Sequence, residues 1–126
     1  MNVAVVDSSC VVAIAMGERA AKGVATRLAE FDRLYAAPLL EAEVRSALRR
    51  EGLAHAPLDL SDFRWIVPSR LLSDEVEQVL EAGYVRGTDC WHLACALYLA
   101  TDPGELSFLT LDVQQRKVAH TLGFMT

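Results

Sequence analysis

The sequence predicts a single α/β domain over residues 1–126, in which a small parallel sheet of about four or five strands lies between two layers of helices, an α/β/α arrangement. Short apolar runs alternate along the chain with longer segments whose apolar residues follow the period of a helix. The first of these runs, residues 3–6, is apolar at every position, which is typical of a strand covered on both faces. A chain of 126 residues that is 52% hydrophobic can bury a core of this kind.

The first half of the chain is expected to hold two strands and three helices. Strands are expected at residues 3–6 and 34–37, and helices at residues 10–16, 20–30 and 38–51. Ser8 or Ser9 is expected to cap the first helix, because serine side chains accept hydrogen bonds from the free N–H groups at a helix start. Gly17 and Gly52 follow the first and third helices, where glycine commonly ends a helix.

The second half is expected to add two strands and three helices. Residues 53–62 contain Pro57 and two aspartates, so we expect a loop there. Strands are expected at residues 63–67 and 107–111, and helices at residues 74–82, at residues 89–100 and after Asp112 to about residue 122. Ser73 and Thr88 are the expected caps of the first two of these helices.

Composition narrows the class of protein. The net charge of −5 argues against a protein that binds nucleic acid mainly through a broad basic surface, but it allows an enzyme with an acidic site and a local basic rim. The three cysteines, Cys10, Cys90 and Cys95, include no C-x-x-C pair, which favours free thiols in a reducing cytosol. With no signal peptide and no apolar run long enough to span a membrane, we expect a cytoplasmic protein.

Four acidic residues occupy positions that suggest a shared site. Asp7 and Asp112 each come directly after a predicted strand. Glu43 and Asp89 lie near the starts of predicted helices, on the stripe that otherwise carries the apolar residues. Because strand ends and the starts of the following helices share one edge of a parallel sheet, we expect the four side chains to converge there.

Converging carboxylates predict a metal site. Carboxylates packed together repel one another unless a cation neutralises them. A set of oxygen ligands without thiolate or imidazole suits Mg²⁺, with Mn²⁺ as a substitute. Such an ion activates water and stabilises in-line displacement at a phosphodiester. The pattern therefore predicts that Asp7, Glu43, Asp89 and Asp112 are catalytic and metal-binding residues.

Simpler roles for the same residues stay open at this point. Asp7 and Asp89 are well placed to begin helices, where a negative charge is favourable, and Glu43 is placed to form an ordinary salt bridge. His92 lies three residues after Asp89, which is a spacing that metal ligands use, but packing between helices is the favoured interpretation. Trp91 is likewise a candidate for stacking an RNA base, with packing favoured.

Four stretches of the sequence, in this order and with this spacing, resemble the four acidic motifs of PIN-domain nucleases. They are Val5-Val6-Asp7-Ser8-Ser9, Pro38-Leu-Leu-Glu-Ala-Glu43-Val-Arg-Ser-Ala-Leu, Thr88-Asp89-Cys-Trp-His-Leu-Ala-Cys-Ala-Leu, and Phe-Leu-Thr110-Leu-Asp112 with the later Ala119-His-Thr-Leu-Gly123. The size of the chain is similar to that of VapC toxins of type II toxin–antitoxin systems.

The resemblance implies a PIN-like nuclease domain over residues 1–126 that acts as a Mg²⁺-dependent endoribonuclease, the toxin of a toxin–antitoxin pair. It implies the same acidic cluster, with Asp7 and Asp89 as the chief metal ligands. It also implies RNA as substrate, a homodimer, a cognate antitoxin as partner and no membrane association. Residues 53–68 depart from the family, which often has a longer helical stretch there, so the departure concerns the dimer contacts more than the site.

RNA at an acidic site needs nearby cations to hold its phosphates. The candidates are Arg19, Arg45, Arg86, Arg116 and Lys117. Thr110 is a candidate for steadying Asp112 or a water, against the role of an ordinary residue at the end of a strand. Two other functions stay open: a PIN-like binding module without catalysis, and a phosphoryl-transfer domain with a phosphorylated Asp7. The second lacks the phosphatase pattern Asp-x-Asp, because Ser9 occupies its last position.

Overall fold

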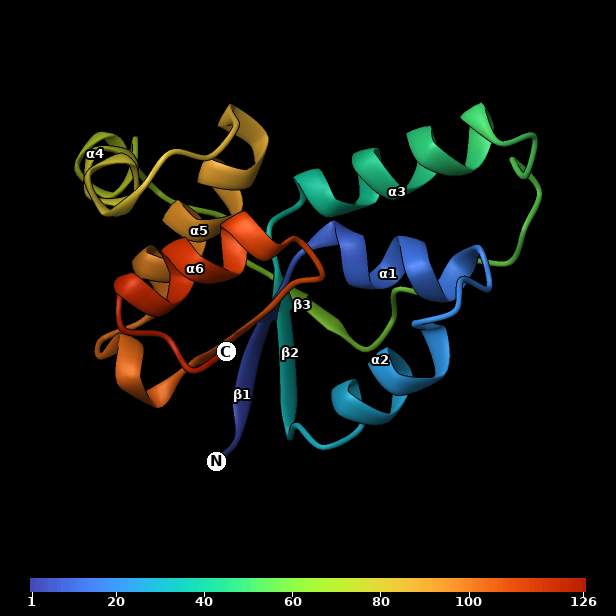
Figure 1. The fold of residues 1–126 in the computed structure, drawn as a ribbon, viewed down its shortest axis with the longest axis horizontal. Coiled ribbons are helices and arrows are strands. Elements are labelled where there is room, and N and C mark those ends of the chain that lie inside the picture. The colour runs from blue at the N-terminus through green and yellow to red at the C-terminus, as the bar shows by residue number, and fades with distance from the viewer.

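The computed structural model describes all 126 residues and shows a four-stranded, all-parallel sheet with the strand order β3-β2-β1-β4 (Figure 1). The strands are β1 (Val3–Val6), β2 (Arg33–Ala36), β3 (Phe63–Trp65) and β4 (Ser107–Leu109). The helices are α1 (Ser8–Ala15), α2 (Ala21–Leu28), α3 (Leu39–Arg50), α4 (Ser73–Ala82), α5 (Gly87–Leu99) and α6 (Val113–Thr121), with a 3₁₀ helix η1 (Pro103–Glu105) before β4. The predicted α/β class and parallel sheet are confirmed.

Strand β1 shows how the molecule divides into three layers. Ala4 and Val6 belong to a core formed with α1, α2 and α3, whereas Val5 belongs to a second core formed with α4, α5 and α6. The two groups of helices lie on opposite sides of the strands (Figure 1). All three residues are fully buried, so the prediction of a strand covered on both faces is confirmed.

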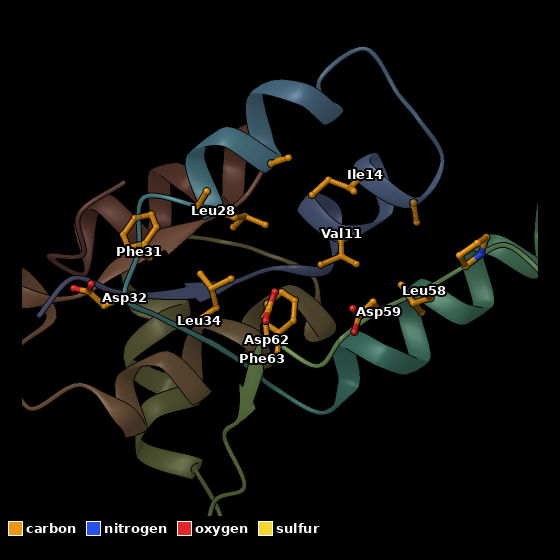
Figure 2. A pocket seen from close by; sticks show the side chains of 14 residues that line it. Val11, Ile14, Leu28, Phe31, Asp32, Leu34, Leu58, Asp59, Asp62 and Phe63 are labelled. Atoms are coloured by element: carbon orange, nitrogen blue, oxygen red, sulfur yellow. The ribbon is translucent and has the colours of Figure 1, made fainter.

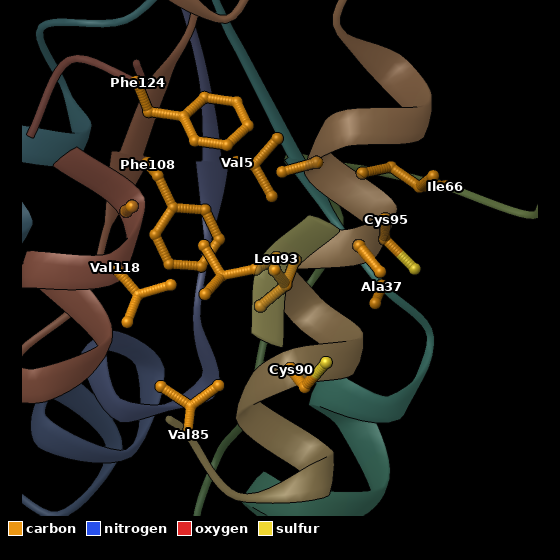
Figure 3. Packing of buried hydrophobic residues seen from close by; sticks show 14 of the residues in the cluster. Val5, Ala37, Ile66, Val85, Cys90, Leu93, Cys95, Phe108, Val118 and Phe124 are labelled. Atoms are coloured by element: carbon orange, nitrogen blue, oxygen red, sulfur yellow. The ribbon is translucent and has the colours of Figure 1, made fainter. Parts of the chain in front are cut away.

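The core on the side of α4, α5 and α6 is built around two aromatic rings. The ring centres of Phe108 and Phe124 are 6.1 Å apart, and Leu93 and Val118 pack around them (Figure 3). Phe124 lies in the C-terminal tail, where the carbonyl of Met125 accepts a hydrogen bond from the Phe108 N–H at 2.8 Å. This tail therefore extends the packing beside β4 and holds the end of α6 against the sheet.

The carboxyl ends of β1 and β4 form one edge. Val6 pairs with Leu109 in the parallel register, and the N–H of Asp7 donates to the carbonyl of Leu109 at 2.9 Å. Asp7 and Thr110, the residues that follow these strands, are therefore neighbours. Helices α1 and α6 begin shortly after this edge, as the sequence predicts.

The predicted caps of α4 and α5 are wrong. Ser73 is the first residue of α4, with Leu72 in the cap position and no side-chain cap bond. Helix α5 starts at Gly87, earlier than expected, because the Cys90 N–H already donates to the carbonyl of Arg86 at 2.8 Å. Thr88 consequently lies inside the first turn, where its side chain is not in a capping position.

Other boundaries agree more closely with the sequence. Residues 53–62 form a loop without a regular helix, as predicted. The strands predicted at residues 63–67 and 107–111 each end two residues earlier, at Trp65 and Leu109. None of the helices has the length and apolar character needed to cross a membrane.

Candidate active site

Asp7 is the most buried of the four acids, with 3% of its surface exposed. It follows β1 and caps α1, since its Oδ2 accepts a hydrogen bond from the Ser9 N–H at 3.0 Å. The expectation that Ser8 or Ser9 is this cap is wrong, because the aspartate just before them already supplies the acceptor. The Ser9 hydroxyl instead accepts a hydrogen bond from the Leu111 N–H at 3.0 Å, which ties α1 to the segment after β4.

Asp112 caps α6 in the same way. Its Oδ1 accepts a hydrogen bond from the Gln115 N–H at 2.7 Å, and its own N–H donates to the Thr110 hydroxyl at 3.0 Å. Thr110 therefore does steady Asp112, as one of the two readings of the sequence has it. In Asp7 and in Asp112 the cap bond occupies one carboxylate oxygen, so capping and metal binding are compatible roles.

The carboxyl ends of β1 and β4, with the acids that gather there, are called the acidic edge below. Glu43 reaches this edge from the first part of α3 and contacts His92 of α5. The Nε2 atom of His92 lies 2.5 Å from Oε1 of Glu43 and 3.8 Å from Oδ1 of Asp7. The side chain of His92 is fully buried, whereas that of Glu43 is 27% exposed. The interpretation of His92 as a packing residue is thus incomplete: its ring packs in the interior, but its Nε2 contacts the acidic cluster.

Two opposing effects set the pKa of His92. Burial disfavours the charged ring, but the hydrogen bond with Glu43 and the negative charges of Asp7, Glu43 and Asp89 outweigh it, so the pKa lies above its ordinary 6.5. The Nδ1 atom of the same ring is the one buried side-chain polar atom without a hydrogen-bond partner. All polar contacts of this imidazole are therefore made toward the acids.

Asp89 lies in the first turn of α5 and is partly exposed. Burial raises the pKa of its carboxyl above the ordinary 3.8, and the negative charges of the other three acids raise it further. The imidazole of His92 acts in the opposite direction. Asp89 is therefore within electrostatic reach of the other three acids, as the predicted convergence requires.

The acidic cluster has the chemistry of a hard-metal site, although its side chains are not closed around one point. No three His, Cys, Asp or Glu side chains are arranged to hold a metal ion as they stand. The donor set nevertheless fits Mg²⁺ or Mn²⁺, because all four acids offer oxygen ligands, and because burial together with the repulsion of the other three acids raises the pKa of Asp89. A divalent cation relieves such repulsion. The assignment of Asp7, Glu43, Asp89 and Asp112 as metal ligands stays a prediction.

Gln115 is a site residue that sequence reasoning missed. It is fully buried in α6, and its side chain contacts Asp7, Thr110 and the backbone of Asp89. The signal was present, because Gln115 lies three residues before Val118 on the buried stripe of its helix. The same rule singled out Glu43 in α3.

The side chains predicted to contact RNA phosphates differ in whether they already form contacts within the protein. Arg45 forms an ion pair with Glu41 at 2.7 Å, and Arg116 donates to the carbonyl of Thr110 at 2.7 Å beside the acidic edge. The remaining three candidates are exposed and form no ion pair: Arg19, Arg86 and Lys117. Arg116 is thus the cation that the structure ties most directly to the site.

A hollow of about 560 Å³ lies away from the acids, between α1, α2, β2 and the loop before β3 (Figure 2). Its walls are mainly apolar, with Val11, Leu28 and Phe63 facing the space and Asp59 and Asp62 beside it. None of the four acids lines it. The acidic edge is therefore separate from this hollow, and the two are distinct features of the surface.

Comparison with known protein families agrees with the fold and with the positions of the four acids. Residues 4–121 match the model of the PIN domain family, which covers nearly the whole chain and all four acids. No curated protein and no solved structure matches the chain significantly. The chain therefore belongs to the PIN domain family, whose members are generally metal-dependent nucleases.

Proposed function

We propose that this PIN domain is a Mg²⁺-dependent endoribonuclease that hydrolyses RNA phosphodiester bonds at the edge formed by β1 and β4. The observation that carries the proposal is the cluster of Asp7, Glu43, Asp89 and Asp112 at the carboxyl end of the sheet, in which the charges of the other three acids act on Asp89. Burial and the negative charges of the other three acids raise the pKa of Asp89, and a divalent cation would relieve this repulsion.

The chain's own residues would hold the cation and orient the substrate. Asp7 is the chief ligand, because its carboxylate is fixed by the Ser9 N–H and by the Gln115 amide before any ion arrives. Asp89, Glu43 and Asp112 add negative charge from three other elements. A bound Mg²⁺ would supply the activation of water and the neutralisation of charge at the phosphodiester.

Substrate binding is proposed to use a local basic rim rather than a basic surface. Arg116 holds the carbonyl of Thr110 beside the site, and its remaining N–H groups are available to a phosphate. Arg86 precedes α5 and is exposed close to Asp89 in the chain. Single-stranded RNA passing the acids would meet these two arginines.

Cleavage assays with acid variants test the proposal. Purified protein should cut RNA with Mg²⁺ or Mn²⁺ and lose the activity in chelator. Asp7→Asn and Asp89→Asn should reduce cutting to the level of a protein-free control. Asp74→Asn is the matched control, since Asp74 is an exposed first-turn acid of α4 outside the cluster. Undiminished cleavage by the two site variants, or in chelator, would show that the activity has another source.

The toxin role, a homodimer and a cognate antitoxin are part of the same proposal and are supported by the resemblance to VapC toxins. Expression of the chain alone in a bacterial host should arrest growth, and Asp89→Asn should not. Co-expression of a neighbouring small open reading frame should relieve the arrest. Unimpaired growth with active protein present would leave a PIN nuclease that is not a toxin.

The two other functions make different predictions. A binding module without catalysis should show no saturable Mn²⁺ binding in calorimetry. A phosphoryl-transfer role requires Asp7 as nucleophile, but Asp7 is 3% exposed and both of its oxygens accept hydrogen bonds. These contacts favour a fixed metal ligand over an attacking carboxylate.

A further inference from the structure

Gln115 connects separate parts of the acidic cluster. It is the third residue of α6 and is fully buried. Its backbone N–H donates to Oδ1 of Asp112 at 2.7 Å. Its side-chain Nε2 donates to Oδ1 of Asp7 at 3.2 Å and to the backbone carbonyl of Asp89 at 3.2 Å. One residue thus joins α6, the end of β1 and the first turn of α5.

The orientation of this amide follows from the chemistry of its partners. The carboxylate of Asp7 and the carbonyl of Asp89 only accept hydrogen bonds, so the NH₂ group must face them. The Oε1 atom then faces the Thr110 hydroxyl, which donates to it at 2.6 Å. A reversed amide would place its oxygen against two acceptors, which is unfavourable in a buried site.

We propose that Gln115 is a positioning residue of the metal site, acting through Asp7 and through the first turn of α5. This role rests on the proposed metal-dependent function. The Ser9 N–H holds Oδ2 of Asp7 and the Gln115 amide holds Oδ1, so the carboxylate plane is fixed from both sides. The second bond of the amide holds the turn that carries Asp89 at a set distance from Asp7.

An uncharged amide is suited to this position. A carboxylate there would add to the repulsion among the acids, and an ammonium would compete with the cation for Asp7. The amide donates to Asp7 without neutralising it, which leaves the negative charge for the metal. Groups that orient metal ligands in this way typically contribute about 10–100-fold to metal affinity.

The neighbouring Gln114 supplies a matched control. It is the same residue type, one position earlier on α6, but it is exposed and its Nε2 donates to the carbonyl of Tyr84 at 3.0 Å. Replacing either glutamine by methionine keeps the approximate length and removes the hydrogen bonds. Only Gln115→Met removes bonds within the acidic cluster.

Calorimetric titration with Mn²⁺ in the absence of RNA tests the role. We expect Gln115→Met to bind Mn²⁺ about 10–100-fold more weakly than wild type with an unchanged number of sites per chain, and Gln114→Met to match wild type. A merely structural loss would lower the number of sites, through unfolded protein, and leave the Kd of the folded fraction unchanged. An unchanged Kd in Gln115→Met therefore overturns the proposal.

A second variant keeps the test decisive if Gln115→Met does not fold. Gln115→Asn retains the amide but lacks one methylene, so it cannot reach both acceptors from α6. A raised Kd in folded Gln115→Asn supports the role, and an unchanged Kd overturns it. Wild type without saturable Mn²⁺ binding would instead overturn the proposed function itself, and the role of Gln115 with it.

Discussion

The imidazole of His92 lies against the carboxylate of Glu43, with Nε2 2.5 Å from Oε1, although the two residues are 49 positions apart in the chain. Helices α3 and α5 belong to opposite layers, so this contact joins them across the carboxyl edge of the sheet. Because the ring is fully buried and its Nδ1 has no partner, the contact with Glu43 is the principal polar interaction of His92.

Removing this contact should release Glu43 from the site. We expect His92→Leu to lower RNA cleavage about 10-fold or more and His92→Gln to lower it less, because glutamine retains an N–H donor. His120→Leu is the control, since His120 lies on the exposed side of α6 and has no acidic partner. Initial rates at saturating Mg²⁺ measure the effect. Equal rates for His92→Leu and wild type would mean that Glu43 does not depend on this histidine.

The raised pKa of His92 predicts how the stability of the metal-free protein depends on pH. A group whose pKa is raised on folding stabilises the folded state fully below its ordinary pKa, here 6.5, and this contribution is lost as the pH rises through the higher value in the folded state. In chelator, the melting temperature should therefore fall as the pH rises above 6.5. The acids that face the ring are Asp7, Glu43 and Asp89.

His92→Gln separates this effect from other titrations. Glutamine does not titrate, so the variant should show a flatter dependence of melting temperature on pH over the same range. Thermal unfolding followed by circular dichroism in chelator measures both proteins. Parallel curves for wild type and variant would assign the pH dependence to other groups.

Much of the fold follows from local patterns in the sequence. The apolar run Val3–Val6 favours a central strand, because a strand covered on both faces buries successive side chains and its short length suits a strand better than a helix. The starts of α1, α4 and α5 were harder to predict. The cap is the last residue with an extended backbone before the helix, and in α1 this residue is Asp7, so neither serine can take the role.

The site was predictable where an acid interrupts an apolar stripe, as Glu43 does. The same signal marks Gln115. An uncharged amide on a buried stripe needs only ordinary hydrogen-bond partners, however, so it indicates a functional site less strongly than a buried carboxylate does. The contact between His92 and Glu43 could not be predicted from local sequence patterns, because Glu43 lies on another helix and in another layer. Nothing in either local sequence indicates that α3 and α5 approach at this edge.

The three cysteine thiols should resist modification in the folded protein. Burial raises the pKa of Cys10 to about 12 and that of Cys95 to about 11, and burial also raises the pKa of Cys90. All three are buried free thiols, so little thiolate forms near neutral pH and reagents cannot reach it. Mass spectrometry after brief alkylation should find no labelled thiol in native protein and three in denaturant. Rapid labelling of Cys10 in native protein would contradict its burial beside the site.

Substitutions at Asp112 should separate its role as a helix cap from its proposed role as a metal ligand. Asn caps helices as well as Asp does, so Asp112→Asn should retain the bond to the Gln115 N–H and the stability of α6 while weakening Mn²⁺ binding. Asp112→Ala loses the cap as well and should lower the free energy of unfolding by about 0.5–2 kcal/mol.

Urea unfolding in chelator and Mn²⁺ calorimetry measure the two roles of Asp112 independently. Asp102→Ala is the control for cap loss, because Asp102 caps η1 outside the acidic cluster by accepting from the Gly104 N–H at 2.9 Å. It should leave Mn²⁺ affinity unchanged. If Asp112→Asn binds Mn²⁺ as tightly as wild type, Asp112 serves only as the cap, and the remaining acids, Asp7, Glu43 and Asp89, must account for the cation on their own.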